Sequence, residues 1–220
     1  KTMLDRSIID TDTGIPMGRI SVSQHDQEDK IFSHAFDNYE LQAGTDQNSI
    51  MDELHEFVDM VFGREATARA YIEKLYRFFV KSEWSSTDET NIINPLTQLL
   101  IDNDYEIMPV VRTILSSQHF YDAGDSDPSD EILGSIIKSP LQLLSSAIRN
   151  LGFVIPNPNE DMDNYYRFSK YFLDNTFFPM AGMILFGPST VAGYPAVFQA
   201  PDYDRQWFSS SAILARYRMI

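Results

Sequence analysis

Apolar residues recur at helical spacing through most of the chain after Ser49, and this periodicity constrains the fold more than any other feature. The first stripe consists of Ile50, Leu54, Phe57, Val58 and Val61. Residues at such intervals share one face of an α-helix, and the glycine that follows, Gly63, is a common helix terminator. The spacing therefore predicts an amphipathic helix that buries this stripe in the protein core.

The same periodicity continues downstream and predicts a succession of helices joined by short connections. They cover about residues 65–80, 94–100, 107–115, 139–152, 161–175 and 204–218. The clearest of them begins at Ser139 and Pro140, a favourable N-cap and first helical residue, and it ends at Gly152. Short connections keep most contacts local, so the helical part is predicted to form one body.

The first 45 residues follow a different pattern. Short runs of β-branched and aromatic residues at 8–9, 20–22 and 31–36 alternate with turn-forming residues, which predicts two or three short strands. His34 alternates with Phe32 and Phe36, which puts its side chain on the packed face of a sheet. The predicted fold class is therefore mainly α: a multi-helix, bundle-like domain with a small N-terminal β-hairpin or short sheet.

We expect residues 1–220 to form a single, mostly helical domain. Its parts are a short β element (1–45), helices (46–186), an irregular segment rich in proline and aromatic residues (187–203) and a terminal helix (204–220). Pro188, Pro195 and Pro201 are the reason to expect irregular structure in residues 187–203, because proline lacks the amide hydrogen that helices and strands use.

Composition excludes several classes of function. Seventeen Lys and Arg stand against thirty-two Asp and Glu, a formal net charge of −15, whereas nucleic-acid binding needs cations that displace counterions from phosphates. We therefore expect no nucleic-acid partner. The chain has no cysteine, which excludes disulfides, thiolate metal sites and a cysteine nucleophile. No apolar run approaches the roughly 20 residues of a transmembrane helix, so no membrane span is predicted.

Several phrases of the sequence, taken in order, resemble one protein family. They are residues 70–80, 111–121, 137–141, 147–152 and 187–195, followed by Trp207 and residues 214–216. His25, Asp26 and Lys30 fit just upstream of these phrases. Over about residues 20–218 the chain resembles the C-terminal half of the bacterial domain-of-unknown-function eighteen-hundred family.

The resemblance implies a large, mostly helical, exported bacterial protein with no established activity, whose N-terminal half is absent from this chain. We therefore expect a periplasmic, cell-surface or extracellular location, although the chain itself carries no signal segment. Tyr194 stands where the family usually has tryptophan, so an aromatic ring is kept and the indole N–H is lost. The missing half, or a partner protein, is an expected binding partner.

Aromatic, carboxylate and amide side chains gather near the C-terminus and form the predicted ligand site. They are Tyr194, Gln199, Asp202, Tyr203, Asp204 and Trp207. Aromatic rings stack on the apolar faces of sugars while polar groups bind the hydroxyls, so this set predicts polysaccharide binding. The alternative is that the irregular segment buries its rings between helices as an anchor.

A candidate metal site lies in the acidic loop at residues 122–131. The loop carries five carboxylates, those of Asp122, Asp125, Asp127, Asp130 and Glu131, and the four aspartates are the predicted ligands. Calcium prefers hard oxygen ligands at such close spacing, so calcium is the one cofactor that the sequence suggests. The alternative is a solvated acidic loop that binds no ion.

The sequence assigns no catalytic residue. The histidines are His25, His34, His55 and His119, and no Gly-x-Ser-x-Gly nucleophile motif accompanies them. His55 and Asp59 share a helix face but depart from the paired-histidine zinc motif, and no third ligand can be named.

Whether the protein is an enzyme is left open. The predicted function is a structural or polysaccharide-binding role at the cell envelope; the alternatives are a glycan-directed hydrolase and an assembly module of a larger protein.

Overall fold

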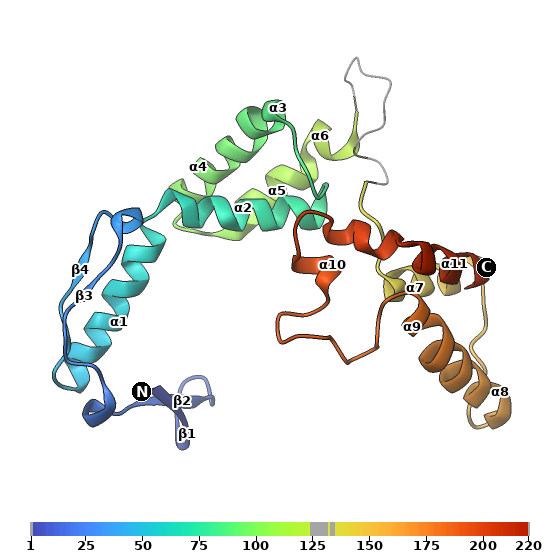
Figure 1. Ribbon diagram of the computed structural model, residues 1–220, viewed down its shortest axis with the longest axis horizontal. Helices are drawn as coiled ribbons and strands as arrows, with labels where there is room; N and C mark the ends of the chain where they lie inside the picture. Colours follow the sequence, from blue (N-terminus) through green and yellow to red (C-terminus); the bar gives the residue numbers. More distant parts are fainter. Residues whose placement is uncertain (1, 124–131, 133–134, 220) are drawn as a thin grey trace. The chain divides into compact units, whose positions relative to one another are not determined.

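The computed structural model describes residues 2–123, 132 and 135–219 (Figure 1). The chain is mainly α-helical with small antiparallel sheets near the N-terminus, which confirms the predicted fold class. Its internal contacts divide it into two compact units. Unit 1 comprises Lys1–Glu73 and Ile92–Ile107, and unit 2 comprises Lys74–Asn91 and Met108–Ile220.

Unit 1 begins with an antiparallel hairpin of strands β1 (Thr2–Ile9) and β2 (Pro16–Ile20). The paired residues are Thr2 with Ile20, Met3 with Arg19, Leu4 with Gly18, and Ile9 with Pro16, and the register shifts between the last two pairs. Asp10 closes the turn, since its Oδ1 accepts hydrogen bonds from the amides of residues 12 and 13 at 2.8 and 2.9 Å. This carboxylate is therefore engaged in shaping the hairpin.

A second sheet pairs β3 (Lys30–Ile31) with β4 (Glu40–Leu41). The chain between them forms a 3₁₀ turn at His34–Phe36, and the His34 side chain is exposed. The prediction of a strand through residue 36, with His34 on its packed face, is therefore wrong. The turn ends at Asp37, whose left-handed backbone (φ 56°) reverses the chain toward β4 before a longer strand can form.

Helix α1 (Gln47–Phe62) lies alongside β3 and β4 (Figure 1). Asp46 caps its N-terminus by accepting hydrogen bonds from the amides of residues 48 and 49, and Gly63 follows its last turn. The helix buries Ile50, Glu53 and Met60. Leu54, Phe57 and Val58 are 47%, 38% and 41% exposed, so the prediction that they form the buried stripe is wrong. The segment around Gly44 covers the side of α1 that carries Glu53 instead.

The rest of unit 1 is built from the first turns of α2 (Glu65–Phe79) and from α4 (Asn94–Asp102), which confirms both predicted helices. Its buried apolar residues include Ala68, Ile72, Ile93, Leu96 and Leu100. The Tyr105 hydroxyl, just after α4, donates to the carbonyl of Phe62 at 2.5 Å. This bond fixes the segment after α4 to the end of α1.

Unit 2 begins with the last residues of α2, α3 (Ser86–Asp88) and the first part of the π-helical segment η3 (Glu89–Ile93), and it resumes in α5 (Ile107–Ser116). Helix α6 (Gln118–Tyr121) follows. The buried Tyr76 hydroxyl and Nε2 of His119 form a 2.8 Å hydrogen bond, and the two rings stack. Tyr76 thereby joins α2 to α6.

The remainder of unit 2 is helical with irregular connections. Its elements are α7 (Pro140–Leu151), α8 (Met162–Tyr166), the π-helix η4 (Arg167–Phe177), α9 (Phe178–Met180), α10 (Pro195–Phe198), the 3₁₀-helix η5 (Tyr203–Phe208) and α11 (Ser210–Met219). Ser139 caps α7 and Gly152, with φ of 65°, ends it, as predicted. The buried cluster includes Leu144, Phe177, Phe178, Met183, Trp207 and Ala215. The core of this part therefore lies where α7, α9, η5 and α11 meet.

Candidate functional site

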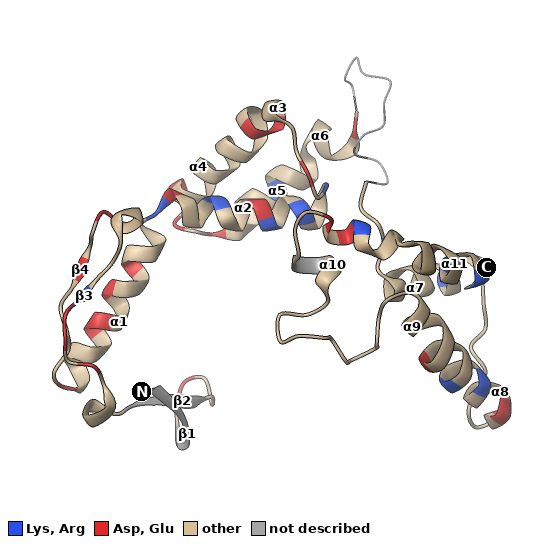
Figure 2. Ribbon diagram, in the orientation of Figure 1, with Lys and Arg blue, Asp and Glu red and all other residues tan. Residues whose placement is uncertain are grey.

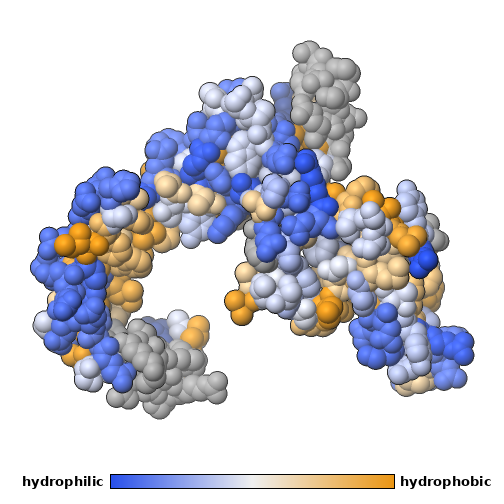
Figure 3. Space-filling view, in the orientation of Figure 1, coloured by the Kyte–Doolittle hydropathy of each residue, from blue (hydrophilic) through white to orange (hydrophobic). Residues whose placement is uncertain are grey.

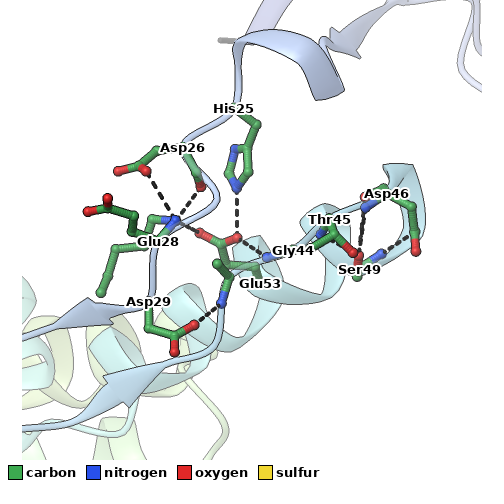
Figure 4. Close-up of polar contacts among 11 residues, drawn as sticks. His25, Asp26, Glu28, Asp29, Gly44, Thr45, Asp46, Ser49 and Glu53 are labelled. Atoms are coloured by element: carbon green, nitrogen blue, oxygen red, sulfur yellow. Dashed lines mark hydrogen bonds and ion pairs between the residues drawn. The ribbon is translucent and has the colours of Figure 1, made fainter.

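A buried carboxylate joins three segments of unit 1, and this cluster is the candidate functional site (Figure 4). Glu53 of α1 is 8% exposed. Its Oε2 accepts hydrogen bonds from Nε2 of His25 at 2.8 Å and from the amide of Gly44 at 2.7 Å. Its Oε1 lies 3.0 Å from Nζ of Lys30. One side chain therefore holds the loop before β3, β3 itself and the loop after β4 against the helix.

The Glu53 carboxyl is held in its ionised form. Burial acts to raise its pKa, but the hydrogen bonds from Gly44, Lys30 and His25 outweigh burial and keep the pKa below the ordinary value of 4.5. Nζ of Lys30 also donates to the carbonyl of Asp26 at 2.7 Å, so the ammonium group is fixed in place. A carboxylate in this setting orients its donors and resists protonation.

Gly44 reaches Glu53 because it has no side chain. A Cβ at this position would lie 2.4 Å from the amide nitrogen of Ile50 and 2.5 Å from its Cα, which is too close for any side chain. The neighbouring amide of Ala43 donates to Oδ1 of Asp29 at 2.9 Å. The backbone can therefore approach α1 this closely only because residue 44 is glycine.

A pocket of about 210 Å³ opens beside the cluster, and it is smaller than the roughly 300–1,000 Å³ of sites that enclose a drug-sized ligand. It is lined by His25, Lys30, Phe32, Leu41, Ile50, Glu53, Leu54 and Phe57. The rings of Phe32 and Phe57 are 5.7 Å apart and inclined by 32°. The pocket thus combines apolar walls and two phenyl rings with a few fixed charged groups, which is the usual composition of a small-ligand site.

The sequence pointed to His25 and Lys30 as family-like residues, but it did not identify Glu53. Glu53 follows Ile50 by three positions and precedes Met60 by seven, so all three share the buried face of α1. A buried charged residue needs a partner, so a glutamate in line with Ile50 and Met60 is the feature of the sequence that could have indicated the site. This feature is easily overlooked, because Leu54 and Phe57 form a second, more apolar stripe on the same helix.

The residues of the predicted ligand site are only partly brought together. Trp207 is 5% exposed and its ring lies 6.0 Å from that of Tyr194, whose hydroxyl donates to the carbonyl of Ile184. Oδ2 of Asp204 accepts a 2.7 Å hydrogen bond from the amide of Ile137. Gln199 and Asp202 are exposed. Tyr194 thereby anchors the irregular segment, and Asp204 and Trp207 anchor η5. Ligand binding by these residues stays a prediction.

Tyr203, also in the predicted ligand site, takes part in a separate stack. The guanidinium carbon of Arg77 lies 4.7 Å from the ring centre of Tyr203 and 4.6 Å from that of Trp84. Two aromatic rings therefore contact one cation within unit 2. The Tyr203 ring is engaged in this stack rather than in a common surface with Trp207.

The acidic loop is described only at its start. Oδ2 of Asp122 accepts a 3.1 Å hydrogen bond from the amide of Ile132, while Asp125, Asp127 and Asp130 lie outside the described residues. Within the described ranges, no group of three or more Asp, Glu or His side chains has the arrangement of a metal site. Calcium binding by the loop stays a prediction.

The chemistry available at the Glu53 cluster favours binding over catalysis. Hydrolysis of a glycoside needs a carboxylic acid with a raised pKa and a second carboxylate across the bond. The pKa of Glu53 is lowered, and among the described residues it is the one carboxylate that lines the pocket. His25 and Lys30 line the pocket while bonded to Glu53, and the phenyl rings of Phe32 and Phe57 line it as apolar surface.

Comparison with known proteins identifies one family. A family model described as "Protein of unknown function (DUF1800)" matches residues 15–220, in agreement with the resemblance found in the sequence. No curated protein and no solved structure matches the chain. Along the described chain, every helix is too short or too polar to cross a membrane.

Proposed function

The chain belongs to the DUF1800 family of proteins of unknown function, and we propose that it binds polysaccharide at the bacterial cell envelope through the pocket beside Glu53. The observation that carries this proposal is the placement of two phenyl rings next to three fixed charged groups. The proposal includes export of the protein to the cell envelope, because the proposed polysaccharide ligand is located there.

The rings supply the apolar part of the recognition. Phe57 is 38% exposed and Phe32 is half-buried, so each ring presents one side to the pocket and is held on the other. Sugar rings carry faces of C–H groups that pack on aromatic surfaces. Leu54, 47% exposed, extends the apolar wall beyond Phe57.

The charged groups supply the polar part. Nζ of Lys30 and the ring of His25 line the pocket while Glu53 fixes both. Hydrogen bonds that involve an ionised group are shorter and stronger than those between neutral groups. Sugar hydroxyls both donate and accept, so they match a pocket that offers an ammonium, an imidazole and a carboxylate.

Affinity electrophoresis tests this proposal. The protein is run in native gels that contain one soluble envelope or plant polysaccharide each, and binding is scored as retardation. We expect retardation by at least one polysaccharide, and we expect Phe57→Ala to weaken it roughly fivefold or more, because loss of a central aromatic contact costs more than about 1 kcal/mol.

Phe186→Ala is the matched control. Phe186 is 94% exposed in unit 2, so its truncation removes the same ring from a surface remote in sequence from the pocket residues. Equal weakening by both substitutions, or full binding by Phe57→Ala, would refute the assignment of the pocket. Retardation by none of the polysaccharides would refute the proposed ligand class.

Exposed apolar residues on α1 favour one second candidate, an assembly module. Met51, Leu54 and Val58 are 36%, 47% and 41% exposed, and Figure 3 shows hydrophobic residues gathered along this helix. Such a face is typical of a surface that another protein covers. If Val58→Asp leaves polysaccharide binding unaffected, the exposed face of α1 and the pocket act as two separate surfaces.

A further inference from the structure

An apolar groove in unit 2 lies apart in the sequence from the Glu53 pocket. Its volume is about 290 Å³, roughly twice that of an engineered cavity that holds benzene. It is lined by Leu144, Ala147, Ile148, Leu151, Phe153, Phe168, Phe172 and Arg218. One cation therefore stands at a groove whose other lining side chains are all apolar.

Phenylalanine rings form one wall of the groove. The ring of Phe168 lies 5.8 Å from that of Phe153 and 6.0 Å from that of Phe172, and both pairs are stacked. Phe172 in turn stacks on Phe177, which is 2% exposed. The wall is thus continuous with the buried core of unit 2, and its rings pack against one another.

The groove continues into apolar residues that water now contacts. Leu151 and Phe153 are 70% and 56% exposed, and the next residues, Val154 and Ile155, are 84% and 45% exposed. Exposed apolar area of this kind marks ligand grooves and interaction sites, because leaving it in water is unfavourable. Figure 3 shows hydrophobic residues over the part of unit 2 that contains α7 and α11.

Charge identifies the kind of ligand. Residues 138–220 contain seven Lys and Arg against six Asp and Glu, a net charge of +1, whereas the whole chain carries −15. The last turn of α11 carries Arg216 and Arg218, and Figure 2 shows blue residues at this end of the helix. Within the described residues, no carboxylate forms an ion pair with the Arg218 guanidinium. A ligand with an apolar tail and an anionic head would match this arrangement.

We propose that the groove binds a fatty acid, with its carboxylate at Arg218 and its acyl chain along the phenylalanine wall. The volume accommodates a tail of about ten carbons. A protein partner fits less well, since a stable protein interface takes about 20–30 residues from each side and the groove offers eight. This site is independent of the polysaccharide pocket, and neither proposal requires the other.

A chain-length series of saturated fatty acids tests the proposal by isothermal titration calorimetry on the full chain, below micelle-forming concentrations. Each buried CH₂ contributes about 0.8 kcal/mol, so affinity is expected to rise about fourfold per CH₂ and to level off near decanoate to dodecanoate. A rise that never levels off would indicate adsorption to exposed surface and would overturn the groove assignment. Absence of binding by every member would overturn the proposal itself.

Two substitutions locate the head and the tail. Arg218→Gln is expected to weaken dodecanoate binding about two- to fivefold, the range of an exposed ion pair, without affecting dodecanol. Arg149→Gln, a matched exposed arginine of α7 outside the groove lining, is expected to change neither. Ala147→Phe fills the groove and is expected to abolish binding of both ligands. Equal effects of the two arginine substitutions, or full binding by Ala147→Phe, would overturn the proposed position.

Discussion

Replacing Glu53 by glutamine tests the central claim about unit 1, that one buried carboxylate fixes three chain segments. A glutamine keeps one acceptor oxygen and gains an NH₂ donor. If the NH₂ replaces Oε1, it faces Nζ of Lys30 at 3.0 Å; if it replaces Oε2, it faces His25 and the Gly44 amide. Either way at least one donor meets another donor.

The expected cost follows from these contacts. A buried hydrogen bond to a charged group is worth about 1.5–3 kcal/mol, and an unpaired buried donor adds a desolvation penalty. Lys30 is 29% exposed and can turn toward water, which limits the penalty at that end. We therefore expect Glu53→Gln to lower the free energy of unfolding of unit 1 by about 2–4 kcal/mol at neutral pH.

The effect should depend on pH with a definite sign. The pKa of Glu53 is lower in the folded than in the unfolded protein, so ionisation stabilises the fold. This contribution is complete above the ordinary value of 4.5 and is lost as pH falls through the lowered pKa of the folded state. The difference between the wild-type protein and Glu53→Gln should accordingly shrink below pH 4.5.

Urea unfolding followed by circular dichroism, together with amide hydrogen exchange at Gly44, measures both effects. The control is Asp52→Asn, which removes one negative charge from the neighbouring, exposed position of α1 and should change stability by less than about 0.5 kcal/mol. Equal urea midpoints for the two variants, with unchanged exchange at Gly44, would refute the claim that Glu53 fixes these segments.

Two further predictions concern the core of unit 2 and the acidic loop. Leu144→Ala, at a position 7% exposed in the cluster with Phe177 and Trp207, should cost about 2–5 kcal/mol in urea unfolding, whereas Leu141→Ala, 42% exposed on the same helix, should cost much less; equal costs would contradict the assigned core. Millimolar calcium, but not magnesium, should raise the melting temperature if the loop at residues 122–131 binds the ion in the folded state alone; an unchanged melting temperature would leave the loop solvated.

Helix positions could be predicted from the sequence wherever local chemistry determined them. The Ser139 cap, Pro140 and the glycine at residue 152 define α7 by contacts within a few residues, and the structure has that helix as expected. The fate of the α1 stripe could not be predicted in this way. Periodicity finds a helix, but the side that becomes buried depends on what packs there, and that was the distant segment at Gly44.

The candidate site was harder to predict for a related physical reason. Its donors come from residues 25, 30 and 44, and its acceptor from residue 53, so no short motif contains it. The aromatic residues near the C-terminus were conspicuous in sequence because they are close together. Yet closeness in sequence did not bring their rings together. Trp207 packs in the buried core, whereas Tyr203 stacks on Arg77.

Net charge illustrates the same distinction between whole-chain and local properties. The negative charge arises before residue 138, where ten Lys and Arg stand against twenty-six Asp and Glu, a net charge of −16, whereas the later residues carry a net +1. Electrostatic attraction is screened over about 8–10 Å, so a ligand at Arg218 responds to nearby charges rather than to the total. The prediction that no nucleic acid binds rests on the net charge of the whole chain, because a long polyphosphate needs many cations along its path. A single carboxylate needs only one arginine beside an apolar groove, and the C-terminal part of unit 2 provides that combination.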